Sequence, residues 1–256
     1  MTDKDATLAF STFVPIGPAR FSLLVNYFGG AKKAWEAPLE QYLKIGFGAK
    51  LAANFEKHRN SLGTSTGLRG YKEKMASLQI RAVTFSDEEY PERLKQIQDP
   101  PFLLYVRGQK STNLANLAEI SISVIGTRKM TAYGKDVAER FASRLAQGGV
   151  TIVSGLALGI DGVAHVAALS VGGATIAVLG NGLDQIYPPA NRGLARDIIY
   201  STKGLLVSEY PLGYPAMPHH FPQRNRIVSG ISSGVLVIEG TKRSGTLLTA
   251  ASAAKQ

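Results

Sequence analysis

The sequence predicts an α/β protein in which a mostly parallel sheet is covered by helices on both faces and preceded by a small all-α domain. Three observations support this fold class. Apolar runs rich in valine, isoleucine and leucine recur in the second half of the chain, helix-like segments separate them, and the first part carries helical patterns punctuated by glycine. Apolar strands that alternate with helices are typical of parallel sheets buried on both sides.

The N-terminal part contains two related segments, Ile16–Gly30 and Ile45–Arg59. Each starts with an Ile-Gly turn and continues into a helical pattern. The pair resembles helix-hairpin-helix or SAM-like units, in which the amides of the glycine turn can touch a DNA phosphate. The alternative is a helical bundle whose glycines only make tight turns. We assign Trp35 and Tyr42 to the packing of this bundle.

A domain boundary is expected in the stretch Asn60–Gly70, which is polar and rich in glycine, serine and threonine. Such composition is typical of a flexible connection. We therefore expect a helical domain over residues 1–66 and the α/β domain over residues 67–256. A helix then leads into the segment Arg81–Leu94.

The predicted strands follow in order along the second domain. The segment Glu119–Leu145 has the pattern of a strand, a Gly-Thr-Arg-Lys turn and an amphipathic helix. Further strands are expected at Thr151–Gly155, Ala174–Gly180, Gly204–Tyr210 and Gly234–Gly240. Parallel sheets bind ligands outside the carboxyl ends of their strands. We expect the segments that follow the strands to lie along one rim: Gly126–Lys129, Ser154–Ala157, Gly180–Asp184, Glu209–Pro211 and Glu239–Gly245.

The turn Gly126–Lys129 is a candidate phosphate site. Its amides and the following helix N-terminus are expected to present unpaired N–H groups, and Arg128 and Lys129 add full positive charges. The spacing is not a dinucleotide fingerprint, because Gly126 is not followed by a G-x-x-G pattern. No P-loop pattern occurs in the chain.

The stretch His219–Gly240 places two arginines and a phenylalanine directly before a strand. Arg224 and Arg226 offer planar charged forks that match phosphate oxygens, and Phe221 offers a face on which a base can stack. Nucleic acid provides both the phosphate oxygens and the base. The alternative is that these residues cap and solubilise a loop that leads into the strand.

These motifs together resemble the DNA-processing protein A family, also called Smf. The resemblance runs from about Tyr90 to Gln256 and rests on six motifs in order: VIGTRKMTAYG, IVSGLALGIDGVAH, IAVLGNGLDQIYPPANRGL, LLVSEYPLG, FPQRNRIVSGIS and VLVIEGTKRSGTLLTA. It implies an extended Rossmann-like fold that binds single-stranded DNA, usually as a homodimer, and helps to load the RecA recombinase during natural transformation. It implies no catalytic residue, no metal and no cofactor.

The resemblance also implies which residues bind the strand. Carried onto this sequence, the positions of the basic pocket and of strand binding are Arg128, Ser154, Gly155, Phe221, Arg224, Asn225, Arg226, Ser244, Gly245 and Thr246, and the candidate phosphate turn adds Gly126 and Lys129. The family pattern continues past the last helix with another strand, whereas the sequence stops at Gln256. We therefore expect either that the sheet lacks its final strand or that the sequence is a fragment, and we expect the chain as given to be a monomer or a weak dimer.

Some residues could also suggest catalysis. Asp161 and His165 have i, i+4 spacing and could share a helix face as metal ligands or as a base and its orienting partner, but an aspartate at a helix start normally caps free amides, so capping and packing are the favoured explanation. Ser154 lacks a G-x-S-x-G pattern and an evident base, so its hydroxyl is expected to bond phosphate or backbone. Glu209 and Glu239 are expected to orient Arg224 and Arg226.

The alternative from a different class is a phosphoribohydrolase-like enzyme on a related fold. There the loop Ser244–Thr246 would hold a nucleotide phosphate, with Glu239 or Glu209 as the acid. Enzymes of that kind have a proline and paired glycines before this Gly-Thr pair. This chain has Thr241–Arg243 at that place instead. The basic run favours a long anionic strand over a mononucleotide.

Composition agrees with a polyanionic partner. The formal net charge is +10 and the isoelectric point is about 9.7. The chain has no cysteine, which excludes a disulfide framework and thiolate metal sites. The start carries no leader pattern and no apolar run is long enough to span a bilayer, so we expect a cytoplasmic protein with no membrane partner.

Overall fold

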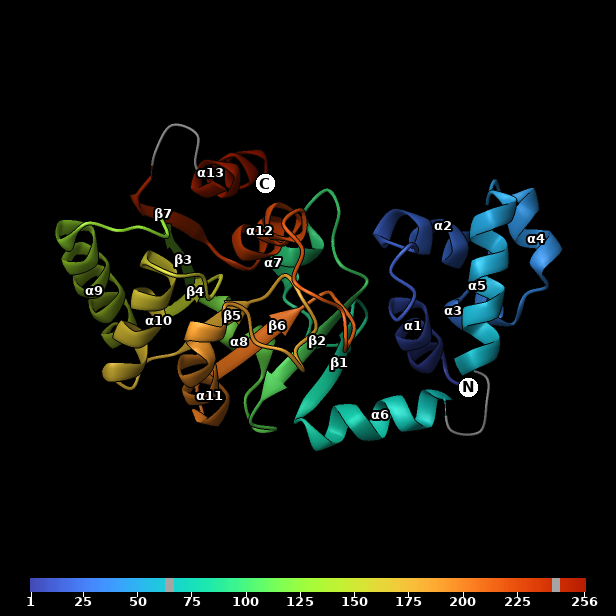
Figure 1. Ribbon diagram of the computed structural model, residues 1–256, viewed down its shortest axis with the longest axis horizontal. Coiled ribbons are helices and arrows are strands. Elements are labelled where there is room, and N and C mark those ends of the chain that lie inside the picture. The colour runs from blue at the N-terminus through green and yellow to red at the C-terminus, as the bar shows by residue number, and fades with distance from the viewer. Residues whose placement is uncertain (63–66, 241–244) are drawn as a thin grey trace.

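The computed structural model describes residues 1–62, 67–240 and 245–256. It has an N-terminal helical region and a larger α/β part (Figure 1). The helical region is built from α1 (Asp3–Ser11), α2 (Pro18–Phe28), α3 (Ala31–Glu36), α4 (Leu39–Lys44) and α5 (Ala49–Leu62). The two Ile-Gly turns join α1 to α2 and α4 to α5.

Aromatic rings fill the centre of the helical region. The Phe10 ring lies 5.0 Å from that of Trp35 and 5.5 Å from that of Phe55, measured between centroids. Trp35 and Tyr42 are buried, which confirms their assignment to packing. The expected boundary after residue 66 falls at the end of the segment 63–66, outside the described residues, so the division into two domains stays a prediction.

The α/β part contains a mixed sheet that is mostly parallel, as the sequence predicts. Its strands are β1 (Ile80–Thr84), β2 (Leu103–Gly108), β3 (Ser121–Gly126), β4 (Thr151–Ser154), β5 (Thr175–Val178), β6 (Gly204–Ser208) and β7 (Gly234–Glu239). The order across the sheet is β1-β2-β6-β5-β4-β3-β7. The pairs among β3 to β7 are parallel, and β2 pairs antiparallel with both β1 and β6.

Helices cover both faces of this sheet (Figure 1). One face carries α7 (Glu92–Lys95), α8 (Leu114–Glu119) and α12 (His220–Ile231), and the other carries α9 (Ala132–Gln147), α10 (Ile160–Ser170) and α11 (Arg192–Tyr200). The short η1 (Pro189–Asn191) precedes α11, and α13 (Gly245–Lys255) packs beside α12 and β7. Successive side chains of β4 point to opposite faces of the sheet, and so each meets a different helix layer. Val153 packs under α12, and its neighbour Ile152 packs under α9 and α10.

The order of the strands locates a crevice. The chain passes from β3 outward through β4 and β5 to β6, and then returns to place β7 on the other side of β3. Ligands of open α/β sheets bind at such a reversal, outside the carboxyl ends of the strands. The turn after β3 and the loop after β4 both lie at that rim.

The structure decides one alternative and corrects one expectation. The alternative that placed Phe221, Arg224 and Arg226 in a loop is wrong, because they lie in helix α12, in agreement with the helix-like segments expected between the strands. Pro222 does not prevent this helix, because a proline in the first turn sacrifices no intrahelical hydrogen bond. Strand β7 was expected to be buried, yet its residues are half-buried and Val237 is exposed. Among the described strands β7 lies at the sheet edge, where neighbours cover it less.

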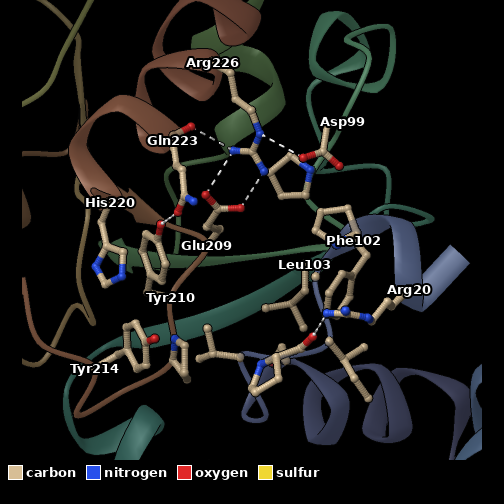
Figure 2. Close-up of a pocket in the computed structure, with 18 of the residues that line it drawn as sticks. Arg20, Asp99, Phe102, Leu103, Glu209, Tyr210, Tyr214, His220, Gln223 and Arg226 are labelled. Atoms are coloured by element: carbon tan, nitrogen blue, oxygen red, sulfur yellow. Dashed lines mark hydrogen bonds and ion pairs between the residues drawn. The ribbon is translucent and has the colours of Figure 1, made fainter. Parts of the chain in front are cut away.

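The helical region packs against the β1–β2 end of the sheet, and a pocket remains at this junction (Figure 2). The Phe21 ring of α2 stacks on Phe102 with centroids 4.0 Å apart, and the Ser11 hydroxyl lies 2.6 Å from the Tyr105 hydroxyl. Both contacts join the first two helices to the residues around β2.

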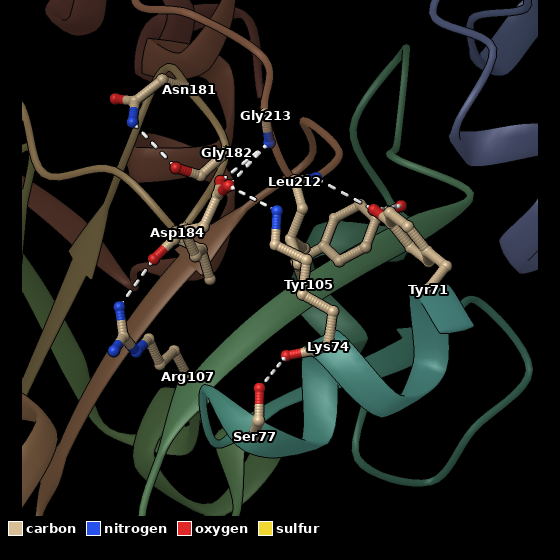
Figure 3. A network of polar contacts seen from close by, with 11 residues as sticks. Tyr71, Lys74, Ser77, Tyr105, Arg107, Asn181, Gly182, Asp184, Leu212 and Gly213 are labelled. Carbon is tan, nitrogen blue, oxygen red and sulfur yellow. Dashed lines mark hydrogen bonds and ion pairs between the residues drawn. The ribbon is translucent and has the colours of Figure 1, made fainter. Parts of the chain in front are cut away.

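Helix α6 (Gly67–Ser77) is joined to the loops after β5 and β6 through a polar network (Figure 3). The Tyr71 hydroxyl accepts a hydrogen bond from the Leu212 amide at 2.9 Å, and Lys74 pairs with Asp184 at 3.4 Å. Asp184 in turn accepts from the Gly213 amide at 2.8 Å. The loops after β5 and β6 are thereby fixed to α6. In the described ranges, no helix combines the length and the apolar character needed to cross a membrane.

Candidate nucleic-acid interface

A cavity of about 480 Å³ lies at the carboxyl ends of β3 and β4. We call it the rim pocket. Its walls come from the turn after β3, the loop after β4, the loop after β5 and the helices α12 and α13. The residues that line it include Gly126, Thr127, Arg128, Gly155, Ala157, Asp161, Tyr187, Pro218, Phe221, Arg224, Asn225 and Gly245.

The turn after β3 places two positively charged side chains at the surface beside the rim pocket. Arg128 and Lys129 are both exposed. Gly126 is required there, because a Cβ would lie 2.5 Å from Cγ1 of Ile160. The N-terminus of α9 was expected to offer unpaired N–H groups, and one of its amides is satisfied, because the Thr131 side chain accepts from the Gly134 amide at 3.0 Å.

Glu239 completes that cap. Its Oε2 accepts from the Thr131 amide at 3.0 Å and lies 3.2 Å from the Thr131 hydroxyl. The expectation that Glu239 orients Arg224 and Arg226 is therefore wrong. The parallel pairing of β7 with β3 explains the difference, since it places the end of β7 beside the start of α9.

The loop after β4 is organised by a buried carboxylate. Oδ2 of Asp161 accepts from the Gly155 amide at 3.1 Å and from the Ala157 amide at 3.4 Å. Asp161 was expected to cap its own helix, but Gly159 is the N-cap residue and Asp161 holds the preceding loop instead. Burial raises the pKa of Asp161, and the nearby Arg224 opposes that rise.

Gly159 allows the sharp entry into α10. Its φ is +79°, and a Cβ there would lie 2.2 Å from the Thr127 carbonyl oxygen. The Ile160 amide donates to that same carbonyl at 3.2 Å. The loops after β3 and β4 are therefore packed backbone against backbone, which fixes the floor of the rim pocket.

Arg224 lies at the back of the rim pocket and is only 4% exposed. Its Nη1 donates to the Gly155 carbonyl at 2.8 Å and to the Val178 carbonyl. Nε has no hydrogen-bond partner among the described residues. Burial lowers the pKa of Arg224 to about 10, against the opposing effect of Asp161. At pH 7 the guanidinium is charged, so it contributes positive potential from beneath the pocket.

Close packing around Arg224 explains two other predicted residues. Gly155 must be glycine, because a Cβ would lie 2.4 Å from the guanidinium nitrogens. Ser154 is fully buried, and its hydroxyl donates to the Val124 carbonyl at 2.7 Å. Of the two expectations for this hydroxyl, the backbone bond is confirmed.

Two rings and a cation form the open side of the pocket. The Arg128 guanidinium carbon lies 5.4 Å from the centre of the Phe221 ring, within cation–π range. Tyr187 is 43% exposed, and its ring centroid lies 5.6 Å from that of Phe221. Tyr187 was missed from the sequence, although it follows β5 within the same set of strand-end loops that led to Arg128. Asn225 also lines this pocket.

Arg226 does not join this group. Nη1 and Nη2 donate to the two carboxylate oxygens of Glu209 at 3.0 and 2.6 Å, and Nε lies 3.6 Å from Asp99. The resemblance implied that Arg128, Arg224 and Arg226 share one basic pocket, but Arg226 does not line the rim pocket. Arg224 and Arg226 are two positions apart on α12, and residues at that spacing point to different sides of a helix. The expectation that Glu209 orients Arg226 is confirmed.

The remaining candidates fall at the start of α13. Gly245 begins this helix and lines the rim pocket. Ser244 lies outside the described residues, as does the side chain of Thr246. The backbone of Thr246 belongs to α13.

His165 is a buried packing residue, as the simpler interpretation has it. Its Nδ1 lies 2.7 Å from the Thr175 hydroxyl, and burial lowers the pKa of the imidazole to about 3. A ring with that pKa is neutral at pH 7. Across the described parts of the chain, no three His, Cys, Asp or Glu side chains are grouped closely enough to hold a metal ion.

Comparison with known proteins identifies the family. The family model of DNA recombination-mediator protein A matches residues 81–256. Protein Smf of Synechocystis is 38% identical over 244 residues, which cover 95% of this chain and 60% of that protein. The chain thus spans about 60% of the length of this relative.

Solved structures agree. The crystal structure of DNA processing protein A from Streptococcus pneumoniae matches with a TM-score of 0.75 and 31% identity, over 100% of this chain and 84% of that one. A structure of DNA processing protein A from Helicobacter pylori, described by its single-stranded DNA binding mode, matches with a TM-score of 0.61 and 32% identity, over 69% of this chain and 76% of that one. The extended Rossmann-like sheet, its six motifs and these matches agree: the chain belongs to the DNA recombination-mediator protein A family.

Proposed function

We propose that the rim pocket binds single-stranded DNA. One observation carries the proposal: the exposed Arg128 lies over the Phe221 ring, with the exposed ring of Tyr187 beside it. A cation beside open aromatic faces matches a phosphate joined to an unpaired base. The strand-binding relative from Helicobacter pylori and the net charge of +10 support the same ligand.

The chemistry of the pocket favours binding without strong sequence preference. A phosphate is the same in every nucleotide, and every base has a face that can stack on a ring. Arg128 is the exposed contact in this account, and the buried Arg224 adds potential and holds the loops in place. Duplex DNA should bind more weakly, because its bases are already stacked and paired.

We further propose that the bound strand is handed to the RecA recombinase during natural transformation, and that the chain acts in the cytoplasm. The family description as a recombination mediator supports this role. Self-association as a weak homodimer is part of the same proposal. A stimulation of RecA filament formation on strands coated with a competing single-strand binding protein would test it, and absence of stimulation would contradict it.

We propose that the chain is a binding protein without hydrolytic activity. Both carboxylates considered as acids are engaged elsewhere: Glu239 caps α9, and Glu209 pairs with Arg226. Incubation with nucleoside monophosphates should release no free base. Sustained base release that disappears in Glu239→Ala would favour the phosphoribohydrolase-like alternative.

The binding proposal is tested by fluorescence anisotropy with a labelled oligothymidylate and a duplex of equal length. We expect tighter binding of the single strand at each salt concentration. The affinity should fall with salt, with a slope of log K against log salt of about −0.7 for each phosphate contacted. Equal affinity for the two forms would contradict the stacking part of the proposal.

A further inference from the structure

A second cavity, of about 470 Å³, lies where the helical region meets the sheet (Figure 2). We call it the junction pocket. The α1–α2 turn, Arg20 and Phe102 line one side, and the residues after β6 and the start of α12 line the other. Cavities between two packed parts of a chain are common ligand sites.

The junction pocket and the rim pocket share helix α12. Phe221 and Arg224 line the rim pocket, whereas His220, Gln223 and Arg226 line the junction pocket. An α-helix with its side chains is about 10 Å across, so about one helix width separates the two cavities. At the entry to α12 the two linings are consecutive in the sequence, because Pro218 lines the rim pocket and His219 the junction pocket.

Aromatic rings form a platform in the junction pocket (Figure 2). The rings of Tyr210 and Tyr214 are parallel to within 2° with centroids 5.5 Å apart, and His220 lies 4.4 Å from Tyr210. Tyr210 and His220 are buried, whereas Tyr214 is partly exposed. The exposed His219 meets His220 edge-on at 4.3 Å. A rigid ring group with a partly exposed member is a surface on which a base can stack.

Arg20 supplies the uncompensated positive charge of this pocket. It is exposed, its Nη1 donates to the Pro15 carbonyl at 2.7 Å, and it forms no ion pair with any described residue. Arg226, in contrast, is neutralised by Glu209 and Asp99. A free guanidinium opposite a ring platform matches a nucleotide, with its phosphate and its base.

We propose that the junction pocket binds a further nucleotide of the same single strand, with its base against Tyr214 and its phosphate at Arg20. This rests on the function proposed for the rim pocket. The strand passes over the start of α12, from Phe221 past His219 into the junction pocket. The helical region thereby contacts DNA directly, through the first turn of α2.

A length series of oligothymidylates from about 4 to about 20 nucleotides tests the path, because that range covers the site sizes of known single-strand grooves. Arg20→Ala and Tyr214→Leu are compared with wild type and with Lys57→Ala, an exposed change on α5. We expect both variants to bind the shortest strands normally and to lose about tenfold in affinity for the longest. Only Arg20→Ala should also lower the salt slope, by about 0.7.

The outcomes separate this inference from the function on which it rests. If both variants match Lys57→Ala at every length while Arg128→Ala weakens binding, the junction pocket binds no nucleotide and the rim pocket stands. If Arg128→Ala changes nothing either, the proposed function fails. Equal losses on short and long strands would also overturn the inference. Arg20 is exposed, so Arg20→Ala carries the test even if Tyr214→Leu fails to fold by circular dichroism.

Discussion

Replacing Arg128 by alanine removes the exposed cation of the rim pocket while leaving its framework in place. The side chain is exposed and its contact with the protein is the cation–π arrangement over Phe221. The fold therefore depends little on it. The loops of the pocket are held instead by the buried Asp161 and Arg224.

The magnitude follows from what Arg128 is expected to contact. A charge-assisted hydrogen bond is worth about 1.5 to 3 kcal/mol, and exposure to water places this one near the lower end. We expect Arg128→Ala to weaken single-strand binding by about 1 to 2 kcal/mol, which is roughly 5- to 30-fold in Kd. One phosphate contact fewer lowers the salt slope by about 0.7.

Anisotropy titrations at several salt concentrations measure both quantities. Arg144→Ala is the matched control, because Arg144 lies in the last turn of α9, at the opposite rim of the sheet. Arg128→Lys should keep the salt slope, since it keeps the charge, and lose only the planar fork over Phe221. If Arg128→Ala binds like Arg144→Ala at every salt concentration, Arg128 contacts no phosphate and the reasoning fails.

Three further changes have separate readouts. Phe221→Leu should weaken binding by about 1 to 3 kcal/mol without changing the salt slope, because stacking releases no counterions; a changed slope in the same titrations would contradict this. Arg224→Met should lower the free energy of unfolding in urea by about 1 to 3 kcal/mol, because the Gly155 and Val178 carbonyls lose a buried donor; unchanged unfolding would show that Arg224 is not structural. The loss of stability between pH 7 and pH 5 should be about 2 kcal/mol larger in wild type than in His165→Gln, because the folded His165 has a pKa of about 3 and stays neutral while the unfolded chain takes up a proton; an equal loss in the two proteins would contradict this.

The sequence was most informative where the same pattern, an apolar strand followed by a helix, recurs along the chain. The apolar runs located β3 to β7, and their carboxyl ends correctly led to Arg128 and the loop at Gly155. Strands β1 and β2 were missed. They lie in the first part of the predicted α/β domain and pair antiparallel, outside the alternation of strands and helices that predicts the later strands.

The division of the arginines could not be predicted from composition. Arg224 and Arg226 look equivalent in the sequence, and only the helical conformation of α12 sends them to opposite sides. The position of Glu239 likewise depends on the pairing of β7 with β3, which joins residues distant in sequence. The buried state of Arg224 follows from close packing at Gly155, and single-residue patterns do not encode such contacts.

The central claim is that single-stranded DNA binds at the carboxyl ends of β3 and β4. Amide hydrogen exchange, measured with and without a saturating oligothymidylate, tests it most directly. We predict slower exchange at residues 126–129, 155–159 and 219–225 when the strand is bound. Unchanged exchange in all three segments, with protection elsewhere on the chain, would place the strand outside the rim pocket and contradict the account.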